Sequence, residues 1–184
     1  KISEVIEDDK NMSIHVKSDD KEDLYGMTFH IGDHVSVWDR GTENLVEAKN
    51  LIEGMLVQVS FHKLTPTTMS IPAQLTPAVV LIQKVGSEKA AYLGEFDDQL
   101  LNSENDLQLN LGPDTLIVNQ KGEALTAKEI QGKTLLVFHE IVTLSIPAQT
   151  TPNKIVLIGE KEEPAPEEEE DKVEDLDQAK EMIA

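Results

Sequence analysis

Residues 61–82 read FHKLTPTTMSIPAQLTPAVVLI, and residues 138–158 read FHEIVTLSIPAQTTPNKIVLI. Both stretches contain Phe-His, then the pentapeptide Ser-Ile-Pro-Ala-Gln, then Thr-Pro and an apolar run typical of a buried strand. We call residues 70–74 and 145–149 the SIPAQ segments. An identical pentapeptide in the same surroundings indicates that one unit occurs twice in this chain.

The match between the two parts extends upstream of the SIPAQ segments. Residues 33–37 (DHVSV) match residues 114–118 (DTLIV), and residues 51–54 (LIEG) match residues 129–132 (EIQG). The repeat is therefore roughly 75 to 80 residues long, which exceeds the repeat length of stacked solenoid units, about 20 to 50 residues. We expect two self-contained domains, at residues 1–86 and 87–160.

Short strands and turns dominate the local pattern of each copy. Apolar residues alternate at 2–6 and at 12–16 around a polar cluster at 8–11, which predicts a β-hairpin. Alternation resumes at 27–31 and 35–38 and stops at a turn, residues 39–42. The same pattern predicts further strands at 55–61, 79–82, 89–96, 107–111, 116–118, 134–139 and 154–158.

Each copy also contains one stretch with helical spacing. Leu45, Ala48 and Ile52 predict a short helix over residues 45–52, with Gly54 as its C-cap. The second copy has its helix near residues 126–130. Five or six short strands with one short helix per copy predict a mostly β fold, namely two tandem small barrels of the oligonucleotide/oligosaccharide-binding (OB) type, or two sandwiches. Closure of a barrel is inferred here from the number of strands.

The composition changes abruptly near the C-terminus. Residues 161–184 contain a block of acidic side chains and few apolar ones. Such a segment buries too little apolar surface to offset the entropy of ordering its backbone. We therefore expect a largely disordered acidic linker or tail.

Charge and composition exclude several classes of function. The chain has 16 Lys and Arg against 35 Asp and Glu, a formal net charge of −19, which repels nucleic acid and anionic lipid. It has no cysteine, so disulfides, thiol nucleophiles and zinc–thiolate sites are excluded. No apolar run approaches the roughly 20 residues that a membrane-spanning helix needs, so no membrane insertion is expected. The chain begins at Lys1, which we interpret as a mature or trimmed product.

No pattern in the sequence predicts catalysis. It contains no glycine-rich phosphate loop, nucleophile elbow or His-Glu-x-x-His motif. His30 and His34 are four residues apart, but they lie in a strand-and-turn context that favours exposed side chains over metal ligation. His62 and His139 each follow a phenylalanine and are predicted to occupy the same place in the two copies. We expect a protein that is not an enzyme and needs no cofactor.

Two acidic clusters are candidates for calcium binding. Calcium prefers several oxygen ligands, and carboxylates supply them. Neither cluster has the spacing of an EF-hand loop, and the default interpretation is a solvated turn. The candidate ligands are Asp8, Asp9, Asp19, Asp20 and Asp23.

The SIPAQ segments with their trailing Thr-Pro are the most informative feature of the sequence. Their prolines restrict the backbone and remove hydrogen-bond donors, and their glutamines both donate and accept hydrogen bonds. One interpretation is a rigid recognition loop. The other, which we favour at this point, is an extended crossover that buries Ile71 and Ile146 and covers a sheet edge. The candidate binding residues are Ser70, Ile71, Pro72, Gln74, Ser145, Ile146, Pro147 and Gln149.

The order strand, short helix ending in Glu-Gly or Gln-Gly, strand, then SIPAQTTPNKIVLI, resembles tandem modules of secreted or cell-surface proteins of Gram-positive, often spore-forming, anaerobes. Such modules are sometimes found ahead of a copper amine oxidase-like N-terminal (stalk) domain. The resemblance covers residues 1–160 and implies an extracellular or cell-surface location and a structural or adhesive role. The arginine-rich signature of the stalk domain is absent, so copper chemistry is not implied.

Three functions therefore stay open. The leading hypothesis is a non-enzymatic extracellular or cell-surface module that serves structural assembly or binds a protein or a cell-envelope component. The second is a calcium- or polysaccharide-binding module. Polysaccharides bind to aromatic rings, and Trp38, Tyr25 and Tyr92 are the only Trp and Tyr residues of the chain. The third is a protease inhibitor that presents the SIPAQ segments.

Overall fold

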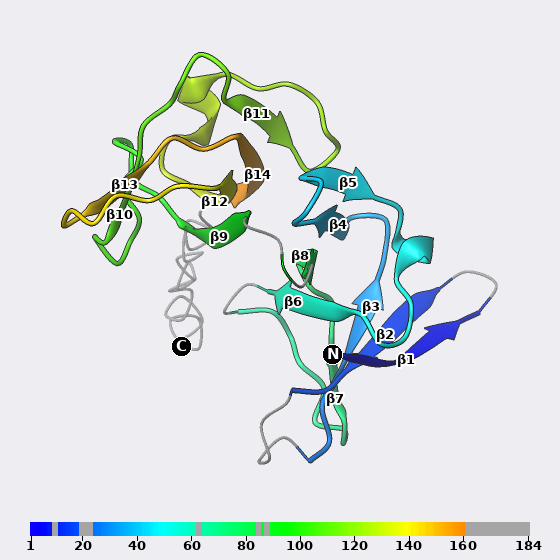
Figure 1. Ribbon diagram of the computed structural model, residues 1–184. Helices are drawn as coiled ribbons and strands as arrows, with labels where there is room; N and C mark the ends of the chain where they lie inside the picture. The colour runs from blue at the N-terminus through cyan, green and yellow to red at the C-terminus, as the bar shows by residue number, and fades with distance from the viewer. Residues whose placement is uncertain (9–10, 19–23, 62–63, 84–85, 87–88, 161–184) are drawn as a thin grey trace, which may run out of the picture.

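The computed structural model describes residues 1–8, 11–18, 24–61, 64–83, 86 and 89–160 (Figure 1). These residues form a mostly β structure with four small sheets, which confirms the mostly β part of the predicted fold class. Helical structure within them is limited to two short 3-10 helices, η1 (Ala48–Asn50) and η2 (Ala127–Ile130). No helix in the described ranges is long and apolar enough to cross a membrane.

Two four-stranded sheets form the N-terminal half. The first has the order β1-β2-β3-β7, in which β1, β2 and β3 pair antiparallel and β7 is parallel to β3. The predicted hairpin is confirmed as β1 and β2. The strands of this sheet are β1 (Ile2–Glu7), β2 (Met12–Val16), β3 (Met27–Ile31) and β7 (Ala73–Leu75).

The second N-terminal sheet has the order β5-β4-β8-β6. It packs on the first sheet through a shared apolar core that includes Ile14, Phe29, Val37 and Val80. Side chains alternate along a strand, so β4 and β8 also present a second apolar face on the side away from this core. The strands of this sheet are β4 (Ser36–Asp39), β5 (Asn44–Val46), β6 (Leu56–Ser60) and β8 (Val79–Gln83).

The C-terminal half contains a four-stranded sheet, β11-β14-β12-β9, and a two-stranded parallel sheet, β10-β13. Its own core includes Phe96, Leu107, Leu135 and Ile155. The strands are β9 (Ala90–Glu95), β10 (Leu107–Leu109), β11 (Leu116–Asn119), β12 (Lys133–His139), β13 (Ala148–Thr150) and β14 (Lys154–Glu160).

Three strand pairings occur in both halves with the same direction. β3 and β7 are parallel, as are β10 and β13; β4 and β8 are parallel, as are β11 and β14. The third pairing is antiparallel, β6 with β8 and β12 with β14. The SIPAQ segments lead into β7 and β13, so each lies at the start of the strand that joins β3 or β10.

The register of these pairings corrects the predicted match of the Phe-His pairs. Val59 pairs with Val80, and Val137 pairs with Ile155, which is the position equivalent to Val80 in the second half. Phe138 is therefore equivalent to Ser60, and His139 is equivalent to Phe61. The Ala78 N–H donates to Ser60 O (2.8 Å), as the Asn153 N–H does to Phe138 O (2.9 Å).

The predicted match of residues 33–37 with residues 114–118 is also wrong by one residue. Val37 pairs with Val80 and Ile117 pairs with Ile155, so Val37 is equivalent to Ile117. Identical letters in a short motif do not fix strand register, which is decided by which side chains reach the core.

Barrel closure and the first helix are not found in the described residues. The four sheets stay open at their edges, so the described strands form no closed barrel. The stretch predicted as a helix, residues 45–52, holds the end of β5 and only the single turn η1. Val46 pairs with Val37, and this edge pairing outweighs a weak helical spacing. The second helix lies where predicted, as η2, with a capping box between Thr126 and Glu129.

The two halves pack against each other through the second faces of their larger sheets. Trp38, Val79 and Leu81 from β4 and β8 meet side chains of β12 and β14. The Trp38 ring lies 6.2 Å from the Phe138 ring, centroid to centroid, and both side chains are fully buried. Figure 1 shows this junction between the β4/β8 region and the β12/β14 region.

Glu43 provides the polar part of the junction. Its buried carboxylate accepts from Lys89 Nζ (2.9 Å) and from Asn153 Nδ2 (3.0 Å), and its carbonyl oxygen accepts from Lys154 Nζ. Lys154 Nζ also lies 5.8 Å above the Trp38 ring. Burial lowers the pKa of Lys154, Glu43 opposes that effect and Lys89 adds to it. The halves are therefore joined by an apolar face and by a set of charged groups.

Candidate functional site

The first SIPAQ segment is part of a loop held by its own hydrogen bonds. We call residues 68–74 the first proline loop. The Thr68 N–H donates to Gln74 O (3.0 Å), and the Gln74 N–H donates to Thr68 Oγ1 (2.9 Å), which closes the loop. Ser70 Oγ donates to Pro72 O (2.8 Å) and lies 2.7 Å from Thr68 Oγ1. The Ile71–Pro72 peptide bond is cis.

The second proline loop, residues 143–149, has the same framework. The Thr143 N–H donates to Gln149 O (2.9 Å), and the Gln149 N–H donates to Thr143 Oγ1 (2.8 Å). Ser145 Oγ donates to Pro147 O (2.8 Å) and lies 2.7 Å from Thr143 Oγ1. The Ile146–Pro147 bond is also cis. Both serines are thus structural parts of their loops.

The apolar side chains of the loops point into solvent, which corrects the expectation that they are buried. Ile71 is 75% exposed and Ile146 is 97% exposed. Met69 and Leu144, two residues earlier, are completely exposed. The polar groups of each loop are satisfied by one another on its inner side, so the alternate side chains are left outside. A recognition loop fits this geometry better than an edge-covering crossover.

The side chains of both glutamines are hydrogen-bonded to a residue on or just after the neighbouring strand. His30 Nε2 lies 3.1 Å from Gln74 Oε1, and Asn110 Nδ2 donates to Gln149 Oε1 (3.0 Å). His30 and Asn110 hold equivalent positions, because Thr28 pairs with Gln74 as Gln108 pairs with Gln149. The glutamines therefore anchor the loops and leave the four apolar side chains as the contact groups.

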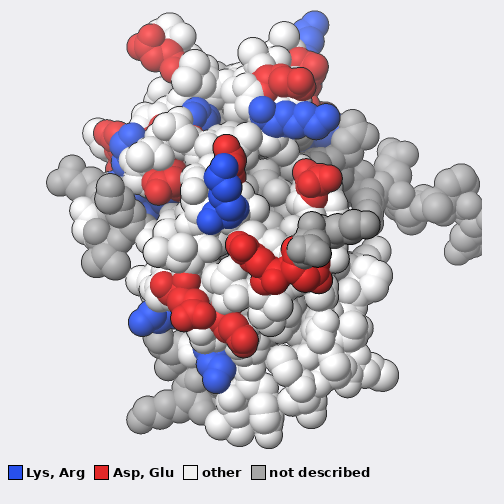
Figure 2. Space-filling view, turned by 90° about the vertical axis from the view of Figure 1, so that its right-hand side faces the viewer, with Lys and Arg blue, Asp and Glu red and all other residues white. Residues whose placement is uncertain are grey.

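Charge is absent from both loops and their flanks. Residues 64–83 and residues 141–153 contain no Asp, Glu, Lys or Arg, in a chain whose net charge is −19. Figure 2 shows charged groups over much of one face of the molecule and a broad uncharged area at its lower right. An uncharged, apolar tip on an acidic protein favours contact with an apolar surface over contact with an ion.

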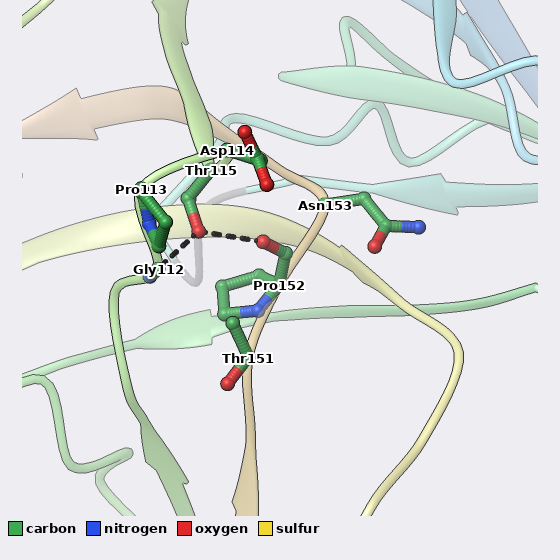
Figure 3. Close-up of a pocket in the computed structure, with 7 residues that line it drawn as sticks. All are labelled: Gly112, Pro113, Asp114, Thr115, Thr151, Pro152 and Asn153. Carbon is green, nitrogen blue, oxygen red and sulfur yellow. Dashed lines mark hydrogen bonds between the residues drawn. The ribbon is translucent and has the colours of Figure 1, made fainter.

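Two shallow hollows lie beside the second proline loop and share Thr151 and Asn153. The larger, about 430 Å³, runs from Gly112 to Thr115 on one side and from Thr151 to Asn153 on the other (Figure 3). Thr115 Oγ1 accepts from the Gly112 N–H (3.0 Å) and donates to Pro152 O (2.8 Å), so its hydrogen bonds are satisfied. The smaller hollow, about 360 Å³, is lined by Thr143 and Gln149 of the loop itself.

Most of the calcium candidates lie outside the described residues, namely Asp9, Asp19, Asp20 and Asp23. Asp8 lies at the turn between β1 and β2, where its Oδ1 accepts from the Asn11 N–H (2.9 Å). Within the described part of the chain, no group of three or more His, Asp or Glu side chains is placed to hold a metal ion. Asp8 alone shows only the turn that the sequence predicts by default.

Among the described residues, the histidines lie in separate places. His30 is held by Ser13 Oγ (2.9 Å from its Nδ1) and by Gln74, and His34 is exposed next to Gly32. His62 lies outside the described residues. His139 is buried at the end of β12, and burial lowers its pKa. None of these arrangements is a catalytic pair.

Sequence reasoning missed Met69 and Leu144 as contact residues. The signal was present, because both stand two positions before the isoleucine of the SIPAQ segment, in the same alternation of polar and apolar residues.

The comparisons with known proteins found no relative: no family model, curated protein or solved structure matches this chain.

Proposed function

We propose that this chain is a tandem pair of β modules, residues 1–86 and 87–160, that binds a protein or another component of the cell envelope and is not an enzyme. The shared strand pairings and the matching hydrogen bonds of the two proline loops support a duplication. The observation that carries the binding role is the display of Met69, Ile71, Leu144 and Ile146 on loops that are already ordered.

Exposed apolar side chains on ordered loops are well suited to binding. Burying a large aliphatic side chain contributes about 1.5 to 3 kcal/mol. A loop that is fixed by its own hydrogen bonds loses little conformational entropy when it docks. Each proline loop therefore offers two apolar anchors at low ordering cost.

The position of the two loops favours a bridging role. The first proline loop precedes β7 at the lower end of the molecule in Figure 1, and the second precedes β13 at the left. The loops therefore contact separate places on a partner or two partners, as expected of a module that serves assembly. An extracellular or cell-surface location, with residues 161–184 as an acidic spacer, is part of this proposal and rests on the resemblance of residues 1–160 to secreted tandem modules.

Photo-crosslinking tests the proposal directly. A photoreactive amino acid replaces Met69 or Leu144, and the protein is irradiated in an extract of the source organism that includes its envelope. We expect a discrete crosslinked product from each tip, and competition by unlabelled wild-type protein. The double variant Ile71→Ser/Ile146→Ser should compete at least tenfold less well, because it lacks two apolar anchors.

Lys121 supplies the matched control, because it is an exposed residue in a turn away from both loops. The photoreactive residue at position 121 should give no such product. Equal products from positions 69, 144 and 121, or equal competition by the Ser variant, would show that the loops are not the contact sites.

A second use of the same loops is presentation to a protease. The exposure of Ile71 and Ile146 on hydrogen-bonded loops favours this alternative. Because the side chains of Gln74 and Gln149 are hydrogen-bonded to His30 and Asn110, the informative variants are Ile71→Ala and Ile146→Ala. Loss of inhibition of an aliphatic-specific protease in these variants would support an inhibitor.

Of the three Trp and Tyr residues, only Tyr25 could support the polysaccharide alternative. Trp38 is buried in the junction and the Tyr92 hydroxyl accepts from Asn102 Nδ2 (2.9 Å), which leaves Tyr25 as the exposed one of the three. A sugar platform needs an exposed aromatic face. Calcium binding stays a prediction that thermal unfolding with and without millimolar calcium tests.

A further inference from the structure

An amine, a carboxylate and a carboxamide meet at the polar part of the junction between the halves. Glu43 Oε1 lies 2.9 Å from Lys89 Nζ and 3.0 Å from Asn153 Nδ2. Both nitrogen atoms contact the same oxygen atom, so they are no further apart than the sum of these two distances. An amine and a carboxamide are the groups from which an amide bond between two side chains is made, and a carboxylate between them can carry protons.

The backbone of Asn153 is held from two sides. Its N–H donates to Phe138 O (2.9 Å), and its carbonyl oxygen accepts from the Leu116 N–H (3.0 Å). Its amide group donates to Glu43 and also to Glu140 Oε1 (3.2 Å). Asn153 directly precedes β14, and Lys89 directly precedes β9. The amine and the carboxamide therefore project from the starts of two strands that flank β12.

Glu43 occupies a backbone position that seldom holds a glutamate. It lies in the turn between β4 and β5, with a φ angle of +57°. Side chains other than glycine and asparagine rarely adopt this left-handed conformation. The Glu43 N–H donates to Asp39 O (2.8 Å), and the residue is only 7% exposed. A buried glutamate at such a position indicates a role for the carboxylate itself.

Burial of the Glu43 carboxylate favours reaction over a simple ion pair. Taking an ion pair out of water costs hydration energy, which narrows the free-energy difference between the charged pair and a neutral acid beside a neutral amine. The neutral amine of lysine is a nucleophile, whereas the ammonium ion is not. The contact between Glu43 and Lys89 therefore supplies both the base and the nucleophile.

We propose that Lys89 and Asn153 form an intramolecular isopeptide bond, with Glu43 as the catalytic residue. Glu43 takes a proton from the Lys89 ammonium ion, and the Nζ lone pair attacks Asn153 Cγ. Glu43 then gives this proton to Nδ2 and accepts a second one from Nζ. The Cγ–Nζ bond forms, the Cγ–Nδ2 bond breaks, and Nδ2 leaves as ammonia. Glu43 finally releases its proton to water, and no oxidant or reductant is needed.

The reaction is a single self-modification without turnover, and it is independent of the proline loops. Glu43 comes from the N-terminal half, whereas Lys89 and Asn153 belong to the C-terminal half, so the bond forms only when the halves are packed together. The equivalent of Asn153 in the N-terminal half is Ala78, whose N–H donates to Ser60 O (2.8 Å). A methyl side chain cannot react, so this position yields one bond per chain.

Intact-mass spectrometry of the purified full chain is the first measurement. Bond formation should lower the mass by one molecule of ammonia, about 17 Da, relative to the mass of the sequence. Trypsin should then release residues 85–121 joined to residues 134–154, because it does not cleave after a modified Lys89. An intact mass equal to that of the sequence would overturn the proposal. Loss of ammonia without the joined peptide would also overturn it, because a cyclised asparagine has the same mass.

Variants of the full chain test the role of each group. Lys89→Arg and Asn153→Ala each remove one bonded group and should give the full mass of their sequences. Glu43→Gln keeps both bonded groups but cannot carry protons, so the yield of joined peptide should fall about tenfold or more. Lys154→Arg is the matched control, because Lys154 Nζ contacts the main-chain oxygen of Glu43, and it should retain the bond.

Trp38 fluorescence shows whether the junction is intact in each variant, since this ring is buried there. An unchanged yield in Glu43→Gln would overturn catalysis by Glu43. A bond that persists in Lys89→Arg and is lost in Lys154→Arg would overturn Lys89 as the bonded lysine.

Discussion

At the scale of single residues, His139 shows how position decides chemistry. The sequence grouped it with His62 because both follow a phenylalanine. The register places it instead at the position of Phe61, at the end of β12, where it pairs with Ala90 of β9 and is buried. Its Nδ1 atom has no hydrogen-bond partner among the described residues. Burial therefore disfavours the charged form and lowers its pKa below the usual value of 6.5.

This pKa shift predicts a loss of stability in mild acid. Well above pH 6.5 the ring is neutral in both states and has no effect. As the pH falls through 6.5, the unfolded chain takes up a proton that the native state resists, so the free energy of unfolding decreases. The slope reaches about 1.4 kcal/mol per pH unit where only the unfolded state is protonated. Urea unfolding at pH 7.5 and 5.5 measures the effect.

The control variants separate His139 from the other histidines. His139→Gln should reduce the difference in unfolding free energy between the two pH values. His34→Gln, at an exposed position, should leave the difference unchanged. If His139→Gln retains the full wild-type difference, another group is responsible.

At the scale of elements, the proline loops are the most regular units of the chain. Each is closed by one threonine, which accepts from a glutamine N–H and contacts the serine of the loop. This local network, more than burial, keeps the apolar tips in place. Loop order is therefore expected to depend on a single hydroxyl group in each copy.

Thr68→Val tests that dependence. The variant loses the acceptor of the Gln74 N–H, a hydrogen bond that contributes about 1 kcal/mol. We expect the Gln74 amide to exchange roughly fivefold faster, measured by hydrogen exchange and NMR. Thr67→Val is the matched control, because its hydroxyl makes only a long contact of 3.4 Å with Thr65 O. Unchanged protection of Gln74 in Thr68→Val would show that the hydroxyl does not hold the loop.

At the scale of the whole molecule, the junction between the halves makes them interdependent. Trp38 belongs to the N-terminal half but is buried against Phe138 of the C-terminal half. The sequence predicts two self-contained domains, and the packing predicts that residues 1–86 alone expose an apolar sheet face.

The isolated fragment tests this interdependence. Trp38 is the only tryptophan, so its fluorescence reports the junction alone. We expect red-shifted emission in the fragment 1–86 relative to the full chain, together with self-association at high concentration. In the full chain, Phe138→Ala should lower the free energy of unfolding by about 3 to 5 kcal/mol. A monomeric fragment with the emission of the full chain would contradict the prediction.

The sequence by itself determined the β class, the hairpin of β1 and β2, the position of η2 and the two proline loops. These features depend on alternation, turn residues and capping groups within a few residues of one another, and such local signals are legible in a sequence. The helix over 45–52 failed because Val46 found a partner in Val37, which lies on another strand.

Only the tertiary structure decided which apolar residues are buried and which are displayed. Ile71 and Trp38 are both large apolar residues in strand-rich surroundings, yet the first is exposed and the second is enclosed by the other half of the chain. The exposure of the loops and the register of Phe138 both depend on contacts between residues far apart in sequence. Burial is a property of the assembled sheets, and no local pattern contains it.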